Sequence, residues 1–462
     1  MTPLRAMRVR DRSTALRFRV GPADPAYIAI FAGLAAAIPL AAAAATIRPA
    51  TTLLALAVLI VVGVTLVRTD VAVMLLIATG PLESAFATSG SLSVTKIAGG
   101  LAFVSFGLYI ARSHRPLVLE HLQWIVLAIL GIALLSATQA HDLSVATTTA
   151  SRYASFVALY IVISQLQPTP TLQRRIAWVF AVASTISAIL GLARYFNGRD
   201  TLATLAYANP NDFAFILATS LPLMFWLLGG RRIFAPIVLG MIGVVFAAIL
   251  LSLSRGTLVG LVAGMLFLIV TDRRRLQIAL VGGLLAAVAA GLVIHSNPQR
   301  FQNAVSLKQH VAQANVTTRF EAWSIAARLA SDHPLIGVGP GNFRDYYTQL
   351  SGQPPGTPGL TVAHDAYLDI AAELGVVAAL LFLLYLALSF KRLTIATRRG
   401  DGLPGFAQAL RISLVIAMAC SIFLSEQYYL PFWLIGAVGT ALWAAGERRA
   451  AAEAAPALAP AA

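Results

Sequence analysis

The feature that most constrains this chain is a succession of long apolar stretches, separated by short segments that contain charged residues, Pro or Gly. A helix of about 20 apolar residues is long enough to cross the hydrocarbon core of a bilayer. Hydrophobic residues make up 58% of the 462 positions and charged residues 11%, with a mean hydropathy of +0.79. A soluble domain contains about 25% charged residues. The sequence therefore predicts an all-α integral membrane protein.

The apolar stretches predict about 12–14 transmembrane helices. They are 26–46, 51–67, 71–88, 96–112, 121–139, 151–166, 175–195, 209–229, 233–253, 255–271, 277–295, 364–390, 405–425 and 427–445. Three of them, 51–67, 71–88 and 151–166, are short enough to be re-entrant or interfacial. The predicted organisation is a basic N-terminus (1–25), a first set of spans (26–295), a long loop (296–363), a second set of spans (364–445) and a disordered tail (446–462).

The basic residues predict the orientation in the membrane. They precede the first span and then gather on every second loop, which the positive-inside rule places in the cytoplasm together with both termini. The loop clusters are Arg112/Arg115, Arg174/Arg175, Arg231/Arg232, Arg273/Arg274/Arg275, Lys391/Arg392/Arg398/Arg399 and Arg448/Arg449. Anionic membrane lipids account for the net charge of +15, so the charge requires no nucleic acid as a partner.

The long loop is predicted to lie on the other, non-cytoplasmic side, and a connection of this length is usually functional. Within it, Thr317 or Thr318 is a candidate N-cap, and Trp323, Ala326 and Ala330 recur at helical spacing. We expect an amphipathic helix on the outer surface of the membrane, followed by the glycine-rich turn HPLIGVGPG that begins at His333.

Arginines on the non-cytoplasmic side are not explained by the charge rule. Arg152, Arg194 and Arg255 are predicted at the outer ends of spans, Arg255 in a tight SLSRG turn, and Arg319 lies in the long loop. A charge at the hydrocarbon boundary is costly unless it snorkels, pairs or binds an anion. Several guanidinium groups converging there would suit a polyprenyl diphosphate, since their planar forks bind phosphate oxygens. Snorkelling to lipid phosphates remains open for Arg255.

A histidine and three carboxylates lie at the start of the predicted span 364–390. Asp365, Asp369 and Glu373 are four residues apart, which places them on one helical face, and we expect this face to point to the bundle interior where arginines compensate it. His364 is close to the helix N-terminus, whose dipole favours the neutral imidazole that a general base requires. A capping or headgroup-binding histidine remains an alternative.

A metal site is the other alternative, with His364, Asp365 and Asp369 as ligands. Adjacent helical residues point in different directions, and the chain contains no Asp-x-Asp pair, so we expect no metal here.

At this point the sequence resembles the O-antigen ligase and O-antigen polymerase superfamily, over roughly residues 205 to 390. The resemblance lies in Asn209-Pro210-Asn211, Ser254-Arg255-Gly256, Arg319 with Trp323, the run from His333 to Gly339, Asn342-Phe343, His364-Asp365-Ala366-Tyr367-Leu368 and Glu373-Leu374-Gly375. The chain departs from the family at Asp365, where an uncharged polar residue is common, and at Ala378, where Gly is common. Asn209-Pro210-Asn211 is equally well interpreted as a helix cap.

The resemblance implies a glycosyltransferase of the GT-C type in the bacterial inner membrane, without a metal or other cofactor. It would transfer a glycan from undecaprenyl diphosphate to a sugar hydroxyl at the periplasmic face, with His364 as base and Arg255 and Arg319 on the diphosphate. Arg152, Arg194 and Asp365 are further candidate substrate-binding residues. The acceptor would be lipid A-core for a ligase or a glycan repeat for a polymerase, and in-line displacement predicts inversion. A lipid-linked glycan flippase is the alternative from another class, although no internal repeat supports a transporter.

Overall fold

The computed structural model describes residues 49–85, 94–113, 117–200, 202–206, 209–271, 298–352 and 362–454, with scattered positions between 277 and 295. The predicted N-terminus and the span 26–46 lie outside the described residues, and the span 277–295 is described only in part.

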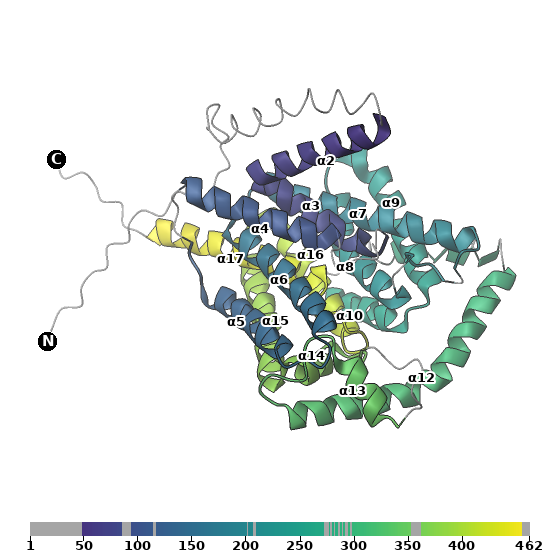
Figure 1. Ribbon diagram of the computed structural model, residues 1–462. Coiled ribbons are helices and arrows are strands. Elements are labelled where there is room, and N and C mark those ends of the chain that lie inside the picture. Colours follow the sequence, from purple (N-terminus) through teal and green to yellow (C-terminus); the bar gives the residue numbers. More distant parts are fainter. Residues whose placement is uncertain are drawn as a thin grey trace, which may run out of the picture.

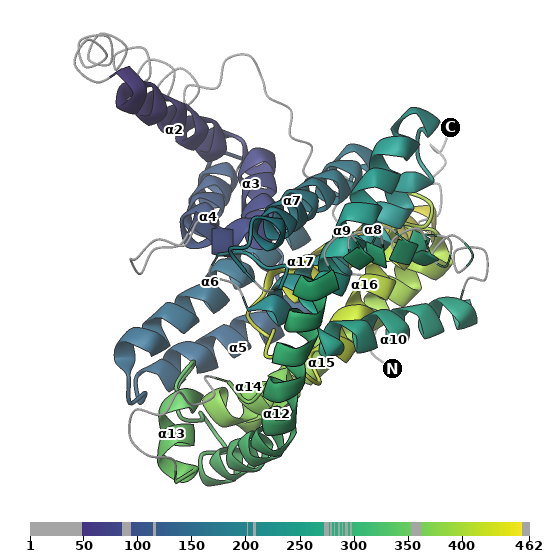
Figure 2. The same cartoon turned by 90° about the vertical axis from the view of Figure 1, so that its right-hand side faces the viewer.

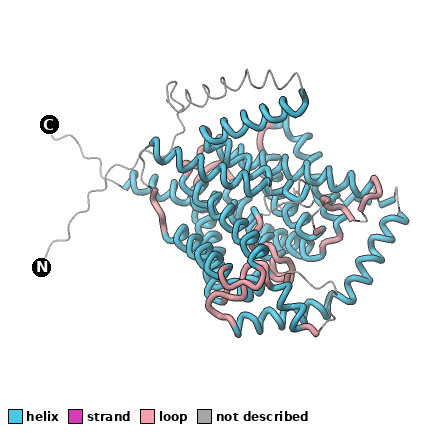
Figure 3. The backbone as a smooth tube through the Cα atoms, in the orientation of Figure 1, coloured by secondary structure: helices cyan, strands magenta, loops and turns pink. Residues whose placement is uncertain are grey.

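The described part of the chain is helical throughout, with loops and turns between the helices and no strand (Figure 3). The bundle helices before the long loop are α2 (Pro49–Val67), α3 (Thr69–Leu82), α4 (Val94–Ser113), α5 (His121–Ala137), α6 (Leu143–Gln165), α7 (Pro170–Phe196), α8 (Pro210–Leu228), α9 (Ala235–Ser252) and α10 (Arg255–Thr271), with short 3-10 helices η1 (Glu83–Ala85) and η2 (Arg232–Phe234). They are followed by α12 (Pro298–Asp332), α13 (Phe343–Leu350), α14 (Ala366–Leu374), α15 (Val376–Arg399), α16 (Phe406–Cys420) and α17 (Leu430–Ala454).

Several of these helices have the length and composition of membrane spans. In the described residues, five segments are long and apolar enough to cross a bilayer: Val94–Arg112, Pro170–Phe196, Pro210–Leu228, Arg232–Ser252 and Val376–Arg399. Shorter apolar helices are Ala55–Val67, His121–Ala137, Arg255–Thr271 and Phe406–Cys420. The predicted all-α integral membrane fold is confirmed. The total of about 12–14 spans stays a prediction, because the span 26–46 falls outside the described residues and 277–295 is described only in part.

Aromatic side chains fill the centre of the bundle, where α17 packs against α6 and α15 (Figure 1). Trp433 is completely buried and stacks on Tyr385 with ring centroids 5.3 Å apart. The Tyr385 hydroxyl donates to the Phe432 carbonyl at 2.8 Å, which satisfies its one polar group.

An outer layer of α12, α13 and α14 covers one end of the bundle and has its own small hydrophobic core (Figure 2). Ala322, Ile325, Ala326 and Leu329 form the buried stripe of α12, and α14 packs against it. The predicted amphipathic helix is therefore present. The predicted N-cap at Thr317 or Thr318 is wrong, because α12 begins at Pro298 and continues through both residues.

The predicted single span 364–390 is also wrong. The chain forms the short helix α14 up to Leu374, breaks at Gly375 with φ of 92°, and begins α15 at Val376. His364 and Asp365 precede α14 rather than lie in its first turn. The histidine therefore lies in a turn outside the spanning helix α15.

A backbone interlock between two glycines causes this break. The glycine-rich turn runs along α14, with Val338 N–H donating to Ala372 O at 3.0 Å and Val376 N–H donating to Pro334 O at 2.8 Å. A Cβ at Gly337 (φ 64°) would overlap the Glu373 carbonyl carbon, and one at Gly375 would lie 2.6 Å from the Leu335 carbonyl carbon. Only glycine permits this approach at both positions.

Candidate functional site

His364 lies in a turn that the surrounding structure holds in an unusual conformation. Its φ of 58° is in the left-handed region, which is uncommon for a residue with a side chain. On one side, Ala363 N–H donates to Asp369 Oδ1 at 2.8 Å. On the other, Ala366 N–H donates to Ser421 O at 2.9 Å. Such strain persists only where neighbouring contacts fix the backbone, and it is concentrated at functional sites.

Arg319 on α12 lies within electrostatic range of this turn, and Arg255, the first residue of α10, lies within electrostatic range of Arg319. Burial lowers the pKa of His364, and the charge of Arg319 lowers it further, to about 4. Burial also lowers the pKa of Arg319, with the charge of Arg255 as the second cause. Electrostatic interactions thus link His364 to Arg319, and Arg319 to Arg255.

Neither arginine has an acidic partner in the described part of the chain. No ion pair is formed there by Arg255 or Arg319, and the Arg319 Nε is buried without a hydrogen-bond acceptor. A buried guanidinium donor without a partner costs free energy. The pair therefore has donors and charge available for an anion.

The predicted tight turn places Arg255. Helix α9 ends at Ser252, Leu253 adopts a left-handed conformation with φ of 51°, and α10 begins at Arg255. The Ser254 and Thr257 hydroxyls hydrogen-bond at 2.9 Å. A Cβ at Gly256 would lie 3.1 Å from Phe423 Cβ, so the first turn of α10 packs on the segment 421–429, which also supports α14.

His364 is neutral above a pH of about 4 and can accept a proton. From the sequence, we predicted that a helix dipole would keep His364 neutral. In the structure the causes are burial first and Arg319 second.

Asp365 has a structural partner set. Its Oδ1 accepts the N–H groups of Tyr367 and Leu368 at 2.9 and 3.0 Å, so it is the N-cap of α14. Burial raises its pKa, and the two backbone hydrogen bonds partly offset this. The expectation that Asp365 belongs to the same helical face as Asp369 and Glu373 is wrong, because the helix begins after it.

Asp369 and Glu373 do point inward, with 0% and 2% of their surface exposed. Compensation by arginines is wrong for these two, because backbone N–H groups are their partners: Ala363 for Asp369, and Gly341 and Phe343 for Glu373. Burial is the main cause that raises their pKa values to about 7 and about 8. The two carboxyl groups therefore hold a proton between them at neutral pH.

Arg152 and Arg194 are held elsewhere. The Arg152 guanidinium is 3.9 Å from a Glu83 carboxylate oxygen and lies over the Tyr428 ring at 5.9 Å. Arg194 Nε donates to Asp200 Oδ2 at 2.6 Å. Both charges already have partners, and the contacts join neither arginine to Arg255 or Arg319. Their role in substrate binding stays a prediction.

A buried acidic pair was missed by the sequence reasoning. Asp212 of α8 accepts a hydrogen bond from the Tyr429 hydroxyl at 2.7 Å and contacts Glu426, which is 0% exposed and has both carboxyl oxygens without another partner. The signal was the polar run Ser425-Glu426-Gln427, in which the span assignment left Glu426 between the spans 405–425 and 427–445.

One alternative from the sequence is decided by geometry. Asn209 caps α8, since its side chain accepts the Asn211 N–H at 2.9 Å, as the cap interpretation predicted. The described residues contain no group of three or more His, Cys, Asp and Glu placed to hold a metal ion, and the carboxylates of Asp365 and Asp369 both accept backbone N–H groups.

These observations define an all-α membrane protein with a neutral histidine and two arginines at one end of its bundle. Residues 240–383, which include His364, Arg255 and Arg319, match the family described as O-Antigen ligase. Over 168 residues the chain is 29% identical to the O-antigen ligase of Pseudomonas aeruginosa, and the match covers 35% of this chain and 38% of that relative. Both findings support the O-antigen ligase-like family, which the resemblance predicted.

Proposed function

We propose that the chain is a glycosyltransferase that moves a glycan from undecaprenyl diphosphate to a sugar hydroxyl. The family supports a ligase- or polymerase-type activity on glycans. The observation that carries the finer proposal is that Arg319 lies close to both Arg255 and an uncharged His364, and that within the described residues neither arginine has an acidic partner.

In the proposed reaction, Arg255 and Arg319 hold the diphosphate and His364 accepts a proton. The acceptor oxygen attacks the anomeric carbon, a new carbon–oxygen bond forms, and the bond from that carbon to the diphosphate oxygen breaks. The acceptor proton goes to the His364 imidazole, and the negative charge that develops on the leaving diphosphate is stabilised by the guanidinium groups. Attack from the face opposite the leaving group inverts the anomeric centre. No step in this scheme calls for a divalent cation.

The acceptor separates two versions of this proposal. Transfer to lipid A-core makes the protein a ligase, and transfer to a second lipid-linked repeat makes it a polymerase. The similarity to the O-antigen ligase of Pseudomonas aeruginosa supports the ligase as the first version. We place the reaction at the periplasmic face of the inner membrane with both termini in the cytoplasm, because the basic loops predict that orientation. Reconstitution with a defined donor and each acceptor in turn distinguishes the two versions.

The main test replaces the histidine. We expect His364→Ala to lower the transfer rate by about 10²–10⁴-fold, the usual contribution of a general base, while donor affinity is retained. The matched control is His333→Ala, because His333 lies in the same outer layer but is exposed and contacts the Tyr346 ring. Transfer at a near-normal rate by His364→Ala would show that another group takes the proton.

A second test concerns the diphosphate. Arg255→Ala should weaken donor binding, whereas Arg328→Ala should not, because Arg328 is exposed and pairs with Asp332 on the same helix. Unchanged donor affinity in the first variant would remove Arg255 from the site. The assay also decides between transferase and flippase, since a transferase releases polyprenyl diphosphate and a flippase only translocates the intact donor.

A further inference from the structure

A second site lies at the opposite end of the bundle, around the last turns of α8. It is a cavity of about 1060 Å³, at the upper end of the ~300–1,000 Å³ usual for small-molecule pockets. His364 precedes α14 and the start of α15, whereas the cavity is lined by Leu403 and Pro404, just beyond the end of α15. The 24 residues of α15 extend about 36 Å, so this cavity is separate from the His364 site.

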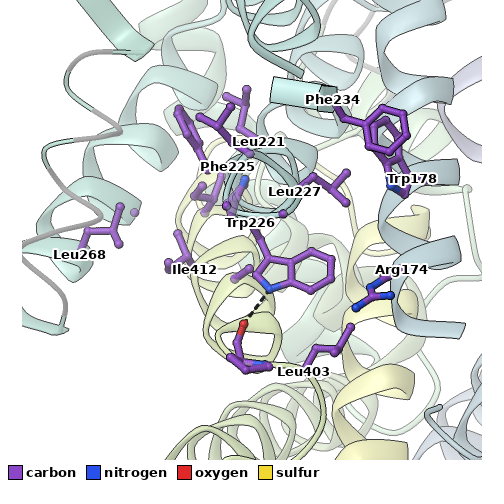
Figure 4. A pocket seen from close by; sticks show the side chains of 18 of the residues that line it. Arg174, Trp178, Leu221, Phe225, Trp226, Leu227, Phe234, Leu268, Leu403 and Ile412 are labelled. Carbon is purple, nitrogen blue, oxygen red and sulfur yellow. Dashed lines mark hydrogen bonds between the residues drawn. The ribbon is translucent and has the colours of Figure 1, made fainter. Parts of the chain in front are cut away.

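The cavity walls are apolar and lie on both sides of α8 (Figure 4). On one side Trp178 of α7 meets Phe234, with ring centroids 5.7 Å apart. On the other side Phe225 of α8 faces Leu268 of α10 and Ile412 of α16. A cavity lined in this way in a membrane protein suits hydrocarbon chains, and its extension on both sides of one helix suits more than one chain.

Cations line the same cavity. Arg174, Arg175 and Arg231 contribute to its wall. Asp70 pairs with Arg175 at 2.9 Å, but within the described residues no ion pair is formed by Arg174 or Arg231, and both are exposed. Figure 4 shows Arg174 beside Leu227 and Leu403, at the edge of the apolar walls. Guanidinium groups bordering an apolar groove complement a molecule with hydrocarbon chains and a phosphate headgroup.

We propose that this groove binds an anionic glycerophospholipid from the leaflet opposite the His364 site, with its acyl chains beside α8 and its phosphate at Arg174 and Arg231. The charge favours an anionic lipid over a zwitterionic one, because two of the three guanidinium groups have no acidic partner in the part of the chain that the structure describes. The polyprenyl tail of a donor fits less well. Its phosphates would lie near Arg255, about 20 Å along α10 from Leu268, so the tail would bring hydrocarbon rather than phosphate to Arg174.

Native mass spectrometry of the full chain tests this proposal. The protein is extracted from bilayers that contain equal amounts of phosphatidylglycerol and phosphatidylcholine, with a small fraction of polyprenyl phosphate. We expect phosphatidylglycerol to be retained, and its occupancy-derived affinity to fall about tenfold in Arg174→Gln and in Arg231→Gln, since each loses one charge-assisted contact to phosphate. Arg398→Gln is the matched control, because Arg398 is an exposed cation at the same end of the bundle but outside the cavity wall.

A second variant tests whether the apolar walls bind the acyl chains, without a change of charge. Met265→Trp fills the groove wall on α10 and should reduce retention of phosphatidylglycerol to the level of the weaker lipids. Four results would overturn the proposal: no lipid retained by the unmodified protein, equal retention of phosphatidylcholine, preferential retention of polyprenyl phosphate, or equal loss in Arg398→Gln. The His364 reaction is not involved in any of these readouts, so the outcome is independent of the proposed function.

Discussion

The arginine beside His364 offers the sharpest test of the site, because it acts on a measurable pKa. Burial and Arg319 together lower the pKa of His364 from 6.5 to about 4. At about 1.4 kcal/mol per tenfold change, this corresponds to about 3 kcal/mol against protonation of the ring. At pH 5.5 the neutral ring then outnumbers the protonated one by about thirty to one, whereas an unperturbed histidine would be protonated about ten to one.

Arg319→Gln removes one of the two causes and keeps a side chain of similar length. The pKa of His364 should rise from about 4 and remain below 6.5, because burial is the larger cause and persists. The acid limb of kcat/KM reports the pKa of the free enzyme's base, so it should move to higher pH in this variant. The maximal rate should also fall, by about 10²–10³-fold if Arg319 stabilises the leaving diphosphate.

The measurement is a pH–rate profile for transfer with a defined donor, combined with ¹³C NMR of histidine-labelled protein in which His364→Ala identifies the resonance. Arg328→Gln is the control, since Arg328 is also on α12 but is exposed and pairs with Asp332 at 3.6 Å. An acid limb near 6.5 in the unmodified protein, or the same His364 resonance titration with and without Arg319, would refute the reasoning.

Three further predictions concern the framework of the site. Asp365→Ala should lower the free energy of unfolding by about 1 kcal/mol and Asp365→Asn by much less, since Asn caps a helix as well as Asp does. Equal losses of the two variants in denaturant titrations would contradict the capping role. Gly337→Ala should lower the free energy of unfolding by about 2–5 kcal/mol, because of left-handed strain and overlap with the Glu373 backbone. Gly352→Ala should lower it by about 1 kcal/mol, since Gly352 has the same sign of φ but open space around it. Equal losses of thermal stability in the two variants would argue against the interlock. Because the pKa of Glu373 is raised to about 8, the folded state binds more protons than the unfolded state between about pH 4.5 and 8, so stability should fall as pH rises through this interval. Glu373→Gln should make the dependence of melting temperature on pH less steep. An unchanged dependence in this variant would contradict the reasoning.

The residues at the centre of the site were predictable because their unusual positions are visible in the chain itself. Arg255 interrupts two apolar runs, and His364 begins an apolar segment after a long polar loop, so each is conspicuous without any knowledge of packing. Arg319 was visible as a cation in the non-cytoplasmic loop, and the family resemblance gave it a role. What the sequence did not provide was the neighbourhood of His364, because its neutrality depends on burial and on a cation from α12, 45 positions earlier in the chain.

The errors have tertiary causes. A single glycine in an apolar helix is commonly tolerated, so Gly375 does not predict a break until the backbone of Leu335 is known to press against it. Glu426 looks like a residue of an exposed connection, and only the packing of α16 and α17 encloses it against Asp212. Asp200 follows α7 by four residues and neutralises Arg194 at a spacing that no helical pattern predicts.

The two arginines of the site are anchored in different hydrophobic cores, Arg255 on a helix of the main bundle and Arg319 on α12 of the outer layer. Their mutual repulsion therefore acts across the seam between the two cores and favours separation of the layers. A ligand with two negative phosphates between the arginines would attract both of them and so favour contact between the layers. By linkage, the free energy that such an anion gains by bringing the layers together is added to the free energy required to separate the outer layer from the membrane bundle.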